Sequence, residues 1–392
     1  MPGTLLLGYA LWFAALLGHG VLWVGLVNRL HALAIPRPLL SLLDVPQMVV
    51  LAGVPLLVLS LLVIDPTLLA QWSVGVFFSP GLMAYVGLCW LAALGATLAW
   101  LRRVCWANPP ALRANHTTVV DVAQLLGQKP IGSPFTAWLD WVPGHEMFRL
   151  HVQEKTLVLP RLAPSLEGLS IVHLSDLHFT GRIRQSYFEQ VVDQANALEG
   201  GLVAVTGDIL DVERCLAWLP ETLGRLRGRH GVFFVLGNHD KRLPDTPAVR
   251  RALTSLGLID LGGRWQVLNV SGAHILVAGN EWPWFGPRPG VPSRSAAGGS
   301  AAFRLLLSHS PDQITWARRH DFDLMLAGHT HGGQIRLPGL GPIFSPSVYG
   351  VKYAAGVFDE RPTLMHVSRG ISGQDPLRFR CPPEITKLVL TP

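Results

Sequence analysis

The sequence carries very little charge over its first quarter. Only four charged residues occur up to Leu101: Arg29, Arg37, Asp44 and Asp65. Soluble domains have roughly a quarter of their residues charged, so this part of the chain is not expected to fold as a water-exposed domain. The other charged residues all follow Leu101, and the net charge of +6 therefore belongs to the later part of the chain.

Cysteine is scarce as well. The chain has Cys89, Cys105, Cys215 and Cys381, with no CxxC or metal-knuckle spacing, which argues against a thiolate metal site and against a disulfide framework. This usage mildly favours a reducing compartment. There is also no basic run with interleaved aromatic residues. We therefore expect the basic excess to serve an anionic substrate or membrane surface, and no nucleic acid.

Long apolar runs take the place of charge in the first quarter. They are Leu5–Val27, Gln47–Ile64 and Gly81–Leu101. About 20 apolar residues suffice for a helix to cross a bilayer, so we expect about three transmembrane helices. A cleaved signal peptide is an alternative for the first run, although no Lys or Arg precedes it. A buried soluble helix pair is an alternative for the second run, which is shorter and contains Pro55.

The basic residues beside these runs predict an orientation. Arg29 and Arg37 follow the first run, and Arg102 and Arg103 follow the third, whereas the connection Asp65–Pro80 has neither Lys nor Arg. Cytoplasmic loops carry the excess of Lys and Arg. We therefore expect an integral protein of the inner or plasma membrane whose catalytic domain faces the cytoplasm.

The chain divides into three expected regions. Residues 1–104 form the membrane region, residues 105–165 a juxtamembrane linker, and residues 166–392 a catalytic domain. A long helix is not expected in the linker because of its prolines, among them Pro109, Pro110, Pro130, Pro134 and Pro143. Its Trp138 and Trp141 are expected either to anchor at the membrane interface or to pack on the soluble domain. The composition of Gly286–Ala302 predicts an irregular loop.

Short apolar runs that end abruptly in polar residues begin at Leu169. They are Leu169–Leu174, Leu202–Thr206, Val232–Leu236, Phe303–Leu307 and Leu324–Ala327. Helix-like segments lie between them, at Ser186–Leu198, Ala217–Leu226, Thr246–Leu256 and Pro311–Arg319. This alternation predicts an α/β domain with parallel strands. Ligands bind beyond the carboxyl ends of such strands, so the residues that follow the runs are the candidates for a site.

Those strand-end residues are rich in nitrogen and oxygen donors. They are Asp176, His178, Asp208, Asn238, His239, Asp240, His309, His329 and His331. A single donor at such a position is usually a turn residue or a helix N-cap, but five strand ends carry them here. The set is too large for one four-coordinate ion and suits two ions that share a bridging carboxylate. His, Asp and Asn ligands without thiolate favour Mn²⁺, with Fe or Zn²⁺ as alternatives.

Glycines flank these donors. Gly207, Gly237 and Gly328 are expected to let the chain turn sharply at the metal edge without a Cβ clash.

The ordered motifs DLH, GD, GNHD, SH and GHTH resemble those of the calcineurin-like metallophosphoesterase family. The resemblance covers about Leu166 to the C-terminus, and it implies a four-layer α-β-β-α sandwich of two mixed sheets flanked by helices. It further implies that Asp176, His178 and His331 hold one metal, that Asn238, His309 and His329 hold the other, and that Asp208 bridges. His239 would not be a ligand but would stabilise the transition state or protonate the leaving oxygen, and Asp240 would orient it.

The resemblance implies hydrolysis of a phosphodiester or pyrophosphate bond by in-line attack of a metal-bound hydroxide. The apolar runs together with Ser368–Ile385 are similar to the membrane-anchored branch, some of whose bacterial members hydrolyse UDP-2,3-diacylglucosamine. We therefore expect a lipid-linked substrate, with Trp282, Trp284 and Phe285 either receiving acyl chains or packing in the core. A phosphatase or cyclic-nucleotide phosphodiesterase of soluble substrates and a non-catalytic membrane scaffold are the alternatives.

Overall fold

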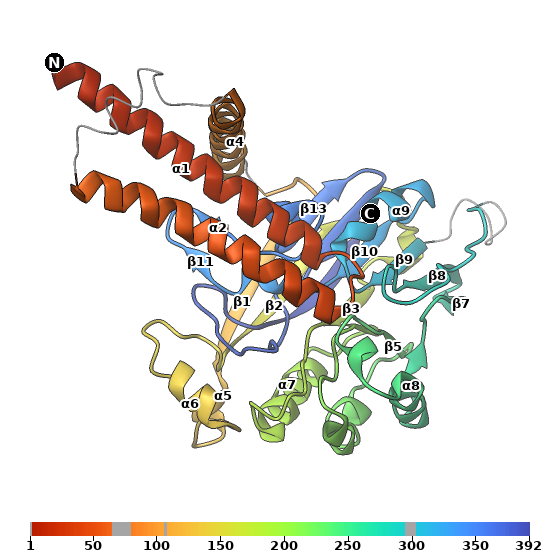
Figure 1. Ribbon diagram of the computed structural model, residues 1–392. Coiled ribbons are helices and arrows are strands. Elements are labelled where there is room, and N and C mark those ends of the chain that lie inside the picture. Colours follow the sequence, from red (N-terminus) through yellow and green to blue (C-terminus); the bar gives the residue numbers. More distant parts are fainter. Residues whose placement is uncertain (1, 65–79, 106–107, 295–302) are drawn as a thin grey trace. The chain divides into compact units, whose positions relative to one another are not determined.

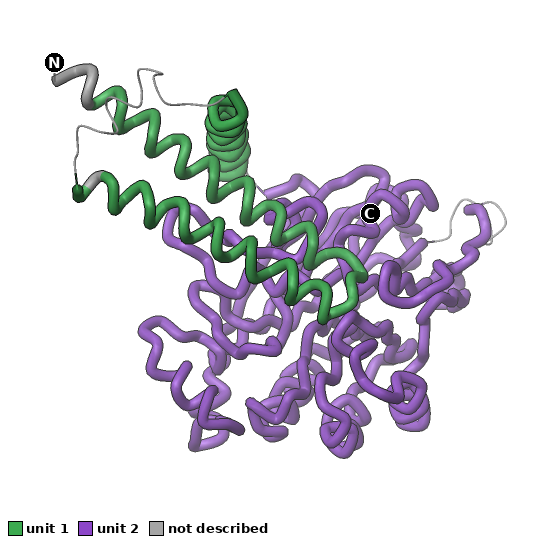
Figure 2. Tube along the Cα trace, in the orientation of Figure 1, with its two compact units in different colours: residues 1–107 green, residues 108–392 purple. Residues whose placement is uncertain are grey.

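The computed structural model describes residues 2–64, 80–105, 108–294 and 303–392. The chain forms two compact units, Met1–Ala107 and Asn108–Pro392, which Figure 2 distinguishes by colour. Two expected segments fall partly outside the described residues: the connection between the second and third apolar runs, at 65–79, and the end of the loop 286–302, at 295–302.

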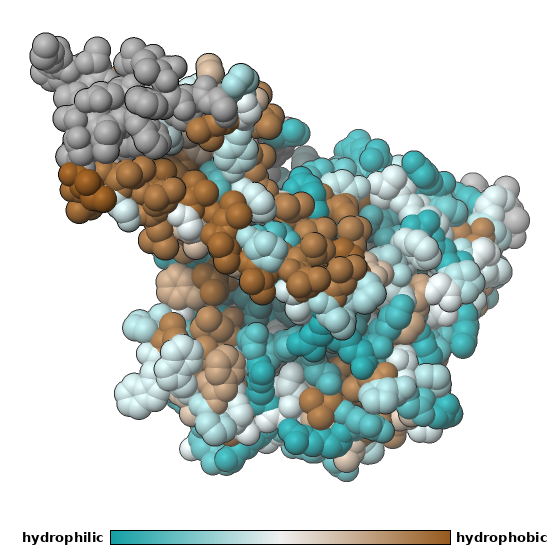
Figure 3. Space-filling model, viewed as in Figure 1, coloured by the Kyte–Doolittle hydropathy of each residue, from teal (hydrophilic) through white to brown (hydrophobic). Residues whose placement is uncertain are grey.

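The first unit consists of long apolar helices. Its described residues form α1 (Pro2–His31), α2 (Arg37–Ile64) and α4 (Pro80–Cys105). Each has the length and composition to cross a membrane, and in Figure 3 hydrophobic side chains gather over α1 and α2. Helix α2 begins earlier than the expected run and includes Asp44, whose carboxylate lies 3.0 Å from Nε2 of His31.

Helices α1 and α4 pack closely against each other. A Cβ atom on Gly18 would lie 1.7 Å from the carbonyl oxygen of Cys89, so only glycine allows this approach. Trp23 donates a hydrogen bond to the hydroxyl of Tyr85 at 3.0 Å, and Nδ1 of His19 lies 2.6 Å from the same oxygen. Small residues at the contact and polar pairs between helices are typical of membrane helix packing.

The second unit contains two mixed sheets (Figure 1). The first has the order β1-β2-β15-β3-β4-β5-β6, formed by Leu112–Asp121, Arg149–Val158, Glu384–Thr391, Ser170–Leu174, Leu202–Thr206, Val232–Val235 and Ile259–Asp260. The second has the order β13-β14-β10-β9-β8-β7, formed by Gly356–Glu360, Thr363–Val367, Leu324–Ala327, Phe303–Ser308, Ala273–Asn280 and Trp265–Val270. Strands β11 (Arg336–Leu337) and β12 (Gly341–Pro342) make a separate hairpin.

Three apolar cores separate four layers. Side chains such as Ile171, Phe233 and Leu305 fill the space between the two sheets. The outer face of the first sheet packs against α7 (Gln185–Ala197) and α8 (Thr246–Ser255). The outer face of the second packs against α9 (Ile314–Arg319) and a short 3-10 segment at Gly350–Tyr353. The expected α-β-β-α sandwich is confirmed.

The strands expected in the catalytic part are present as β3, β4, β5, β9 and β10, and they run parallel to their neighbours in this set. One expected helix is wrong. Ala217–Leu226 instead begins within one 3-10 segment, Glu213–Trp218, and contains a second, Leu223–Arg225, because Pro220 interrupts the helical hydrogen bonds.

The segment expected as a linker contributes two strands to the first sheet. It supplies β1, α5 (Val122–Leu125), α6 (Pro134–Leu139) and β2, and β2 lies beside β15 at the C-terminal end of the chain. A pairing between strands so distant in sequence leaves no local signal. The side chains of Trp138 and Trp141 are 64% and 85% exposed, so they do not pack in the core of this unit.

Candidate metal centre

The candidate ligands lie beyond the carboxyl ends of strands from both sheets. β3 leads to Asp176 and His178, β4 to Asp208, and β5 to Asn238 in the first sheet, whereas β9 and β10 of the second lead to His309 and to His329 and His331. These residues are buried or nearly so. The sandwich therefore brings together side chains that are far apart in the chain.

The first cluster consists of Asp176, His178, Asp208 and His331, whose candidate ligand atoms all lie within 4.8 Å of one another. The Nε2 atoms of His178 and His331 are 3.2 Å apart. Nε2 of His331 lies 3.5 Å from Oδ1 of Asp176, and Nε2 of His178 lies 3.5 Å from Oδ2 of Asp208. These nitrogen and oxygen atoms face one common point.

The second cluster consists of Asp208, His309 and His329. Nε2 of His309 lies 3.3 Å from Oδ2 of Asp208 and 3.1 Å from Oδ1 of Asn238. The same Asp208 oxygen therefore contacts both clusters. Nε2 of His329 is buried and has no hydrogen-bond partner among the described residues. A buried nitrogen without a partner is costly, and a bound cation would satisfy it, so the donors fit two divalent ions.

The backbone at these residues is strained. Five of them have a positive φ between 49° and 70°: Asp176, His178, Asp208, His329 and His331. Residues other than glycine rarely adopt this conformation, and such strain concentrates at functional sites. The strand-to-loop turns aim the side chains inward at the expense of local backbone energy.

Two glycines leave the room that the ligands need. A Cβ atom on Gly237 would lie 2.2 Å from Oδ1 of Asp208. A Cβ atom on Gly328 would lie 1.8 Å from Oγ of Ser175 and 2.3 Å from Oδ2 of Asp176. The expected reason for glycine at these positions, the lack of space for a side chain, is confirmed.

The candidate ligand histidines differ in their electrostatics. Burial and neighbouring positive groups hold the pKa of His329 and of His331 well below its usual range. Burial opposes protonation of His178 and His309, but nearby carboxylates, with Asp208 common to both, outweigh it and raise the pKa of each to about 9. Burial acts against the Asp208 carboxylate, yet His309 and His239 hold its pKa well below its usual range. The carboxylates that stabilise protons on His178 and His309 would also stabilise a bound cation, and His329 and His331 remain neutral, as metal ligands must.

Asp211 takes the position that we expected for Asp240. Its carboxylate oxygens contact Nδ1 of His239 and, at 2.8 Å, Nδ1 of His178. Asp240 instead accepts hydrogen bonds from the backbone N–H groups of Ile209, Leu210 and Gly237 at 2.8–3.0 Å. Asp240 therefore fixes two loops of the site, and Asp211 orients the imidazoles. A second aspartate, Asp211, follows the candidate ligand Asp208 by three residues. This spacing was the sequence signal for Asp211 that the sequence analysis missed.

Arg242 is a second residue that the sequence analysis missed. Its Nη1 atom lies 2.9 Å from Nε2 and 3.0 Å from Nδ1 of His239, and 3.4 Å from Oε1 of Gln374. Because Nδ1 faces the Asp211 carboxylate, Nε2 is the ring nitrogen available to accept from Arg242. This guanidinium lies beside the candidate acid, where negative charge from a phosphoryl group would arrive.

The aromatic residues that follow β8 differ in how deeply they are buried. Trp284 is 6% exposed, and its ring centroid lies 4.7 Å from that of His329 and 5.3 Å from that of His309. Phe285 packs against the core between the first sheet and its helices. Trp282 is 43% exposed and lies under the Arg288 guanidinium. Trp284 is therefore a wall of the metal centre.

The C-terminal segment forms hydrogen bonds with the loops that carry Asp176 and His331. The backbone N–H of Ser372 donates to the carbonyl of Asp176 at 2.9 Å, and the Ser372 carbonyl lies 3.2 Å from Nδ1 of His331. Arg378 is fully buried and donates to the carbonyls of Arg369 at 2.7 Å and His331 at 3.2 Å. These contacts hold two candidate ligands in place.

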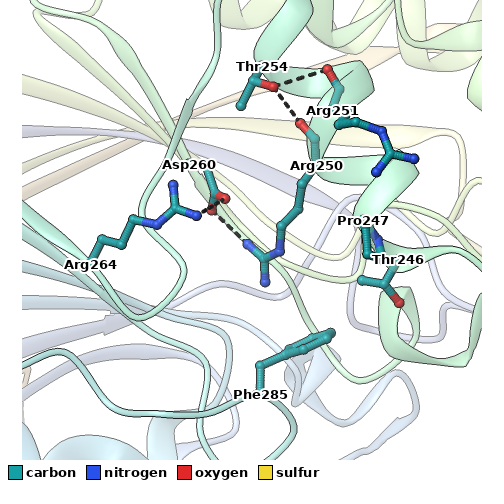
Figure 4. Close-up of a pocket in the computed structure, with 8 residues that line it drawn as sticks. All are labelled: Thr246, Pro247, Arg250, Arg251, Thr254, Asp260, Arg264 and Phe285. Atoms are coloured by element: carbon teal, nitrogen blue, oxygen red, sulfur yellow. Dashed lines mark hydrogen bonds and ion pairs between the residues drawn. The ribbon is translucent and has the colours of Figure 1, made fainter.

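A cavity of about 430 Å³ beside α8 has a different lining, shown in Figure 4. Its Arg250 pairs with Asp260 at 2.7 Å and with Glu281 at 2.5 Å. Glu281 in turn accepts from the N–H of Leu236 at 2.6 Å. The charges here are matched to one another, so this region braces the end of β5.

A four-layer sandwich that carries two clusters of Asp and His side chains at its strand ends, with Asp208 common to both, defines a metal-dependent phosphoesterase. The chain belongs to the calcineurin-like phosphoesterase family, and it is a hydrolase of that family. The family profile matches residues 169–333.

Relatives with similar sequences include bacterial and animal proteins. The uncharacterized metallophosphoesterase YkuE of Bacillus subtilis is 30% identical over 62% of this chain and 87% of its own length. A transmembrane protein with metallophosphoesterase domain from Bos taurus is 30% identical over 72% of this chain and 62% of its own. The UDP-2,3-diacylglucosamine pyrophosphatase LpxG of Chlamydia muridarum is 24% identical over 65% of this chain and 93% of its own.

Proposed function

We propose that this protein hydrolyses a phosphodiester or pyrophosphate bond in a lipid-linked substrate, with two Mn²⁺ ions as its cofactors. UDP-2,3-diacylglucosamine is the specific candidate. The observation that carries the proposal is the Oδ2 atom of Asp208, which lies 3.5 Å from Nε2 of His178 in one cluster and 3.3 Å from Nε2 of His309 in the other. A carboxylate between two groups of imidazoles suits two metals that share one ligand.

The proposed ligands follow the two clusters. Asp176, His178 and His331 would hold one ion, Asn238, His309 and His329 the other, and Asp208 would bridge them. The orphaned Nε2 of buried His329 supports this assignment. When bound, such ions lower the pKa of water and neutralise charge on phosphoryl oxygens.

The residues around the ions would complete the reaction. His239 lies with Nε2 4.0 Å from Oδ2 of Asp208, at the edge of the proposed centre. Asp211 holds Nδ1 of His239, which leaves Nε2 to carry the proton for the leaving oxygen. Arg242 would move from Nε2 to a phosphoryl oxygen, which frees that nitrogen for the proton.

Two observations support a lipid-linked substrate. Three helices among the described residues have the length and composition to span a bilayer, so the catalytic unit is tied to a membrane. The chain is also similar over 93% of the length of a relative named for its action on UDP-2,3-diacylglucosamine. An amphiphilic substrate would reach such an enzyme directly from the bilayer.

The proposed topology places the catalytic domain, residues 166–392, in the cytoplasm beyond the membrane region 1–104 and the connecting residues 105–165. Arg29, Arg37, Arg102 and Arg103 support this orientation because basic residues gather on the cytoplasmic side. Labelling of Ser255→Cys in a Cys105→Ser background, in intact and in opened cells, tests it, because Cys105 is the exposed native cysteine. Labelling from outside intact cells would reverse the assignment.

The full chain, purified in detergent with added Mn²⁺, tests the function. Bis-p-nitrophenyl phosphate, UDP-2,3-diacylglucosamine and a phospholipid should be compared, with Asp208→Asn and His239→Ala as inactive controls. We expect hydrolysis of the first two substrates and its loss in both variants. No hydrolysis of any substrate, with His239→Ala indistinguishable from the natural chain, would overturn the proposal. Faster cleavage of soluble than of lipid-linked diesters would favour a phosphodiesterase of soluble substrates.

A further inference from the structure

The segment that follows the His331 loop exposes an apolar surface. Six of its large hydrophobic side chains are 36–53% exposed: Ile335, Leu337, Leu340, Phe344, Val348 and Tyr349. We call residues 335–349 the apolar hairpin. It contains no Asp, Glu or Lys, and Arg336 is its one charged residue. Such a concentration of apolar side chains on a surface marks an interaction site.

The apolar hairpin is built onto the metal centre. Strands β11 and β12, the latter at Gly341–Pro342, pair in antiparallel register, and β11 begins five positions after His331. A Cβ atom on Gly333 would lie 2.5 Å from Cβ of Pro342 and 3.0 Å from the Phe344 carbonyl oxygen. The base of the hairpin therefore touches the loop that carries a candidate ligand, and any group held on the hairpin lies near that loop.

The hairpin is also held in a fixed position. The backbone N–H of Arg336 donates to the Phe379 carbonyl at 3.0 Å, and the N–H of Phe379 donates to the Gln334 carbonyl at 3.0 Å. The Tyr349 hydroxyl lies 2.9 Å from Oγ1 of Thr315 at the other end. An exposed apolar surface that is braced at both ends is prepared to bind without first having to fold.

The chain itself indicates what covers this surface. Its candidate membrane-spanning helices, α1, α2 and α4, keep a bilayer within reach of the catalytic unit at all times. The absence of acidic residues from the hairpin, together with Arg336, suits an anionic lipid surface. Leucine and aromatic side chains are the residues that enter the boundary between headgroups and acyl chains.

We propose that the apolar hairpin enters the membrane interface and delivers the acyl end of the substrate to the metal centre. Contact with the bilayer stands on the hairpin alone, whereas delivery of substrate rests on the proposed function. Because the hairpin continues directly from the His331 loop, a lipid whose chains lie along it would hold its phosphate at the ligand edge.

The contact is tested with the full chain in lipid nanodiscs. Cys105 is the exposed native cysteine, and the other three are buried. In a Cys105→Ser background, Leu337→Cys or Phe344→Cys is labelled with an environment-sensitive fluorophore, and Ser255→Cys on α8 serves as the control. We expect quenching by lipids with spin-labelled acyl chains at both hairpin positions and none at the control. The proposal is overturned if no quenching occurs at any of the three positions. It is also overturned if the fluorophore at the hairpin emits as in an apolar environment but is not quenched by the labelled lipids, because protein would then cover the hairpin.

Delivery of substrate is tested by Leu337→Asn with Phe344→Ser, matched by Ser255→Asn. We expect kcat/KM for UDP-2,3-diacylglucosamine to fall about tenfold or more, since two apolar contacts are lost, with bis-p-nitrophenyl phosphate unaffected. An equal loss on both substrates would assign the hairpin a structural role and overturn delivery. If the natural chain cleaves neither substrate, the proposed function fails, while the quenching result still decides the membrane contact.

Discussion

Replacing Asp211 by Asn separates the two roles that one carboxylate combines in this site. Asp211 accepts from Nδ1 of both His178 and His239. An asparagine of the same shape has one carbonyl oxygen and one NH₂ group, so it can accept from one imidazole while its NH₂ faces the N–H of the other. One ring must then turn or change tautomer, although the backbone has no reason to move.

The two consequences have different magnitudes. Loss of an oriented general acid costs about 10²–10⁴ in rate, and loss of the carboxylate behind a metal-binding imidazole costs about 10–100-fold in metal affinity. We therefore expect kcat of Asp211→Asn to fall by about 10² at saturating Mn²⁺, with the Mn²⁺ needed for half-maximal activity raised about tenfold.

Steady-state hydrolysis of bis-p-nitrophenyl phosphate across a Mn²⁺ titration measures both effects. Asp193→Asn is the matched control, because Asp193 forms a half-exposed ion pair with Arg225 on the surface of α7. Asp240→Asn provides a contrast. Asp240 accepts three backbone hydrogen bonds, so its loss should lower the thermal midpoint of unfolding and have little effect on the pH profile of kcat. A kcat for Asp211→Asn within about threefold of the natural chain, at saturating metal, would refute this account of the site.

Three further outcomes are expected. Gly328→Ala should lose nearly all activity and bound metal, since its methyl group would lie 1.8 Å from Oγ of Ser175; metal analysis of the purified variant checks this, and full occupancy contradicts it. Arg242→Ala should raise KM about tenfold with a smaller change in kcat, and recovery in Arg242→Lys would show that charge suffices; an unchanged KM would leave the guanidinium without a substrate role. In chelator-treated protein, stability should fall with acidity. Burial lowers the pKa of His173 to about 3, so as the pH falls the unfolded chain binds a proton before the folded chain does. The free energy of unfolding is therefore unaffected by His173 above about pH 6.5 and is about 3 kcal/mol lower at pH 4.5. Thermal midpoints of the natural chain and His173→Asn check it, and parallel pH profiles would count against it.

Short-range patterns account for what could be predicted about the fold. A run such as Leu202–Thr206 is buried on both faces, so it reads as a strand from composition alone, and β4 has these bounds. The exception at Ala217–Leu226 arose because apolar spacing was followed across Pro220. The pairing of β2 with β15 depends on two segments at opposite ends of the catalytic unit, and neither segment carries information about the other.

The candidate ligands were predicted because each follows a recognisable strand within its own short motif. Asp211 and Arg242 were missed because their roles depend on where His239 points, and that direction is set by the turn after β5. The apolar hairpin was missed for a related reason. Its leucines and aromatic residues read equally well as core, and only the packing shows that they remain exposed.

The sequence by itself determined the apolar composition of the first quarter, five strands of the catalytic unit (β3, β4, β5, β9 and β10) and the identity of nearly all donors. Hydrophobic periodicity and motif spacing are local properties, so the sequence is sufficient to reveal them. The tertiary structure decided that Asp208 touches both clusters, that Asp211 rather than Asp240 orients His239, and that the segment after His331 faces outward. The contact of Asp208 with both clusters depends on the meeting of two sheets, and the contact of Asp211 with His239 depends on the pairing of β4 with β5. Both are set by packing between residues that no local pattern connects.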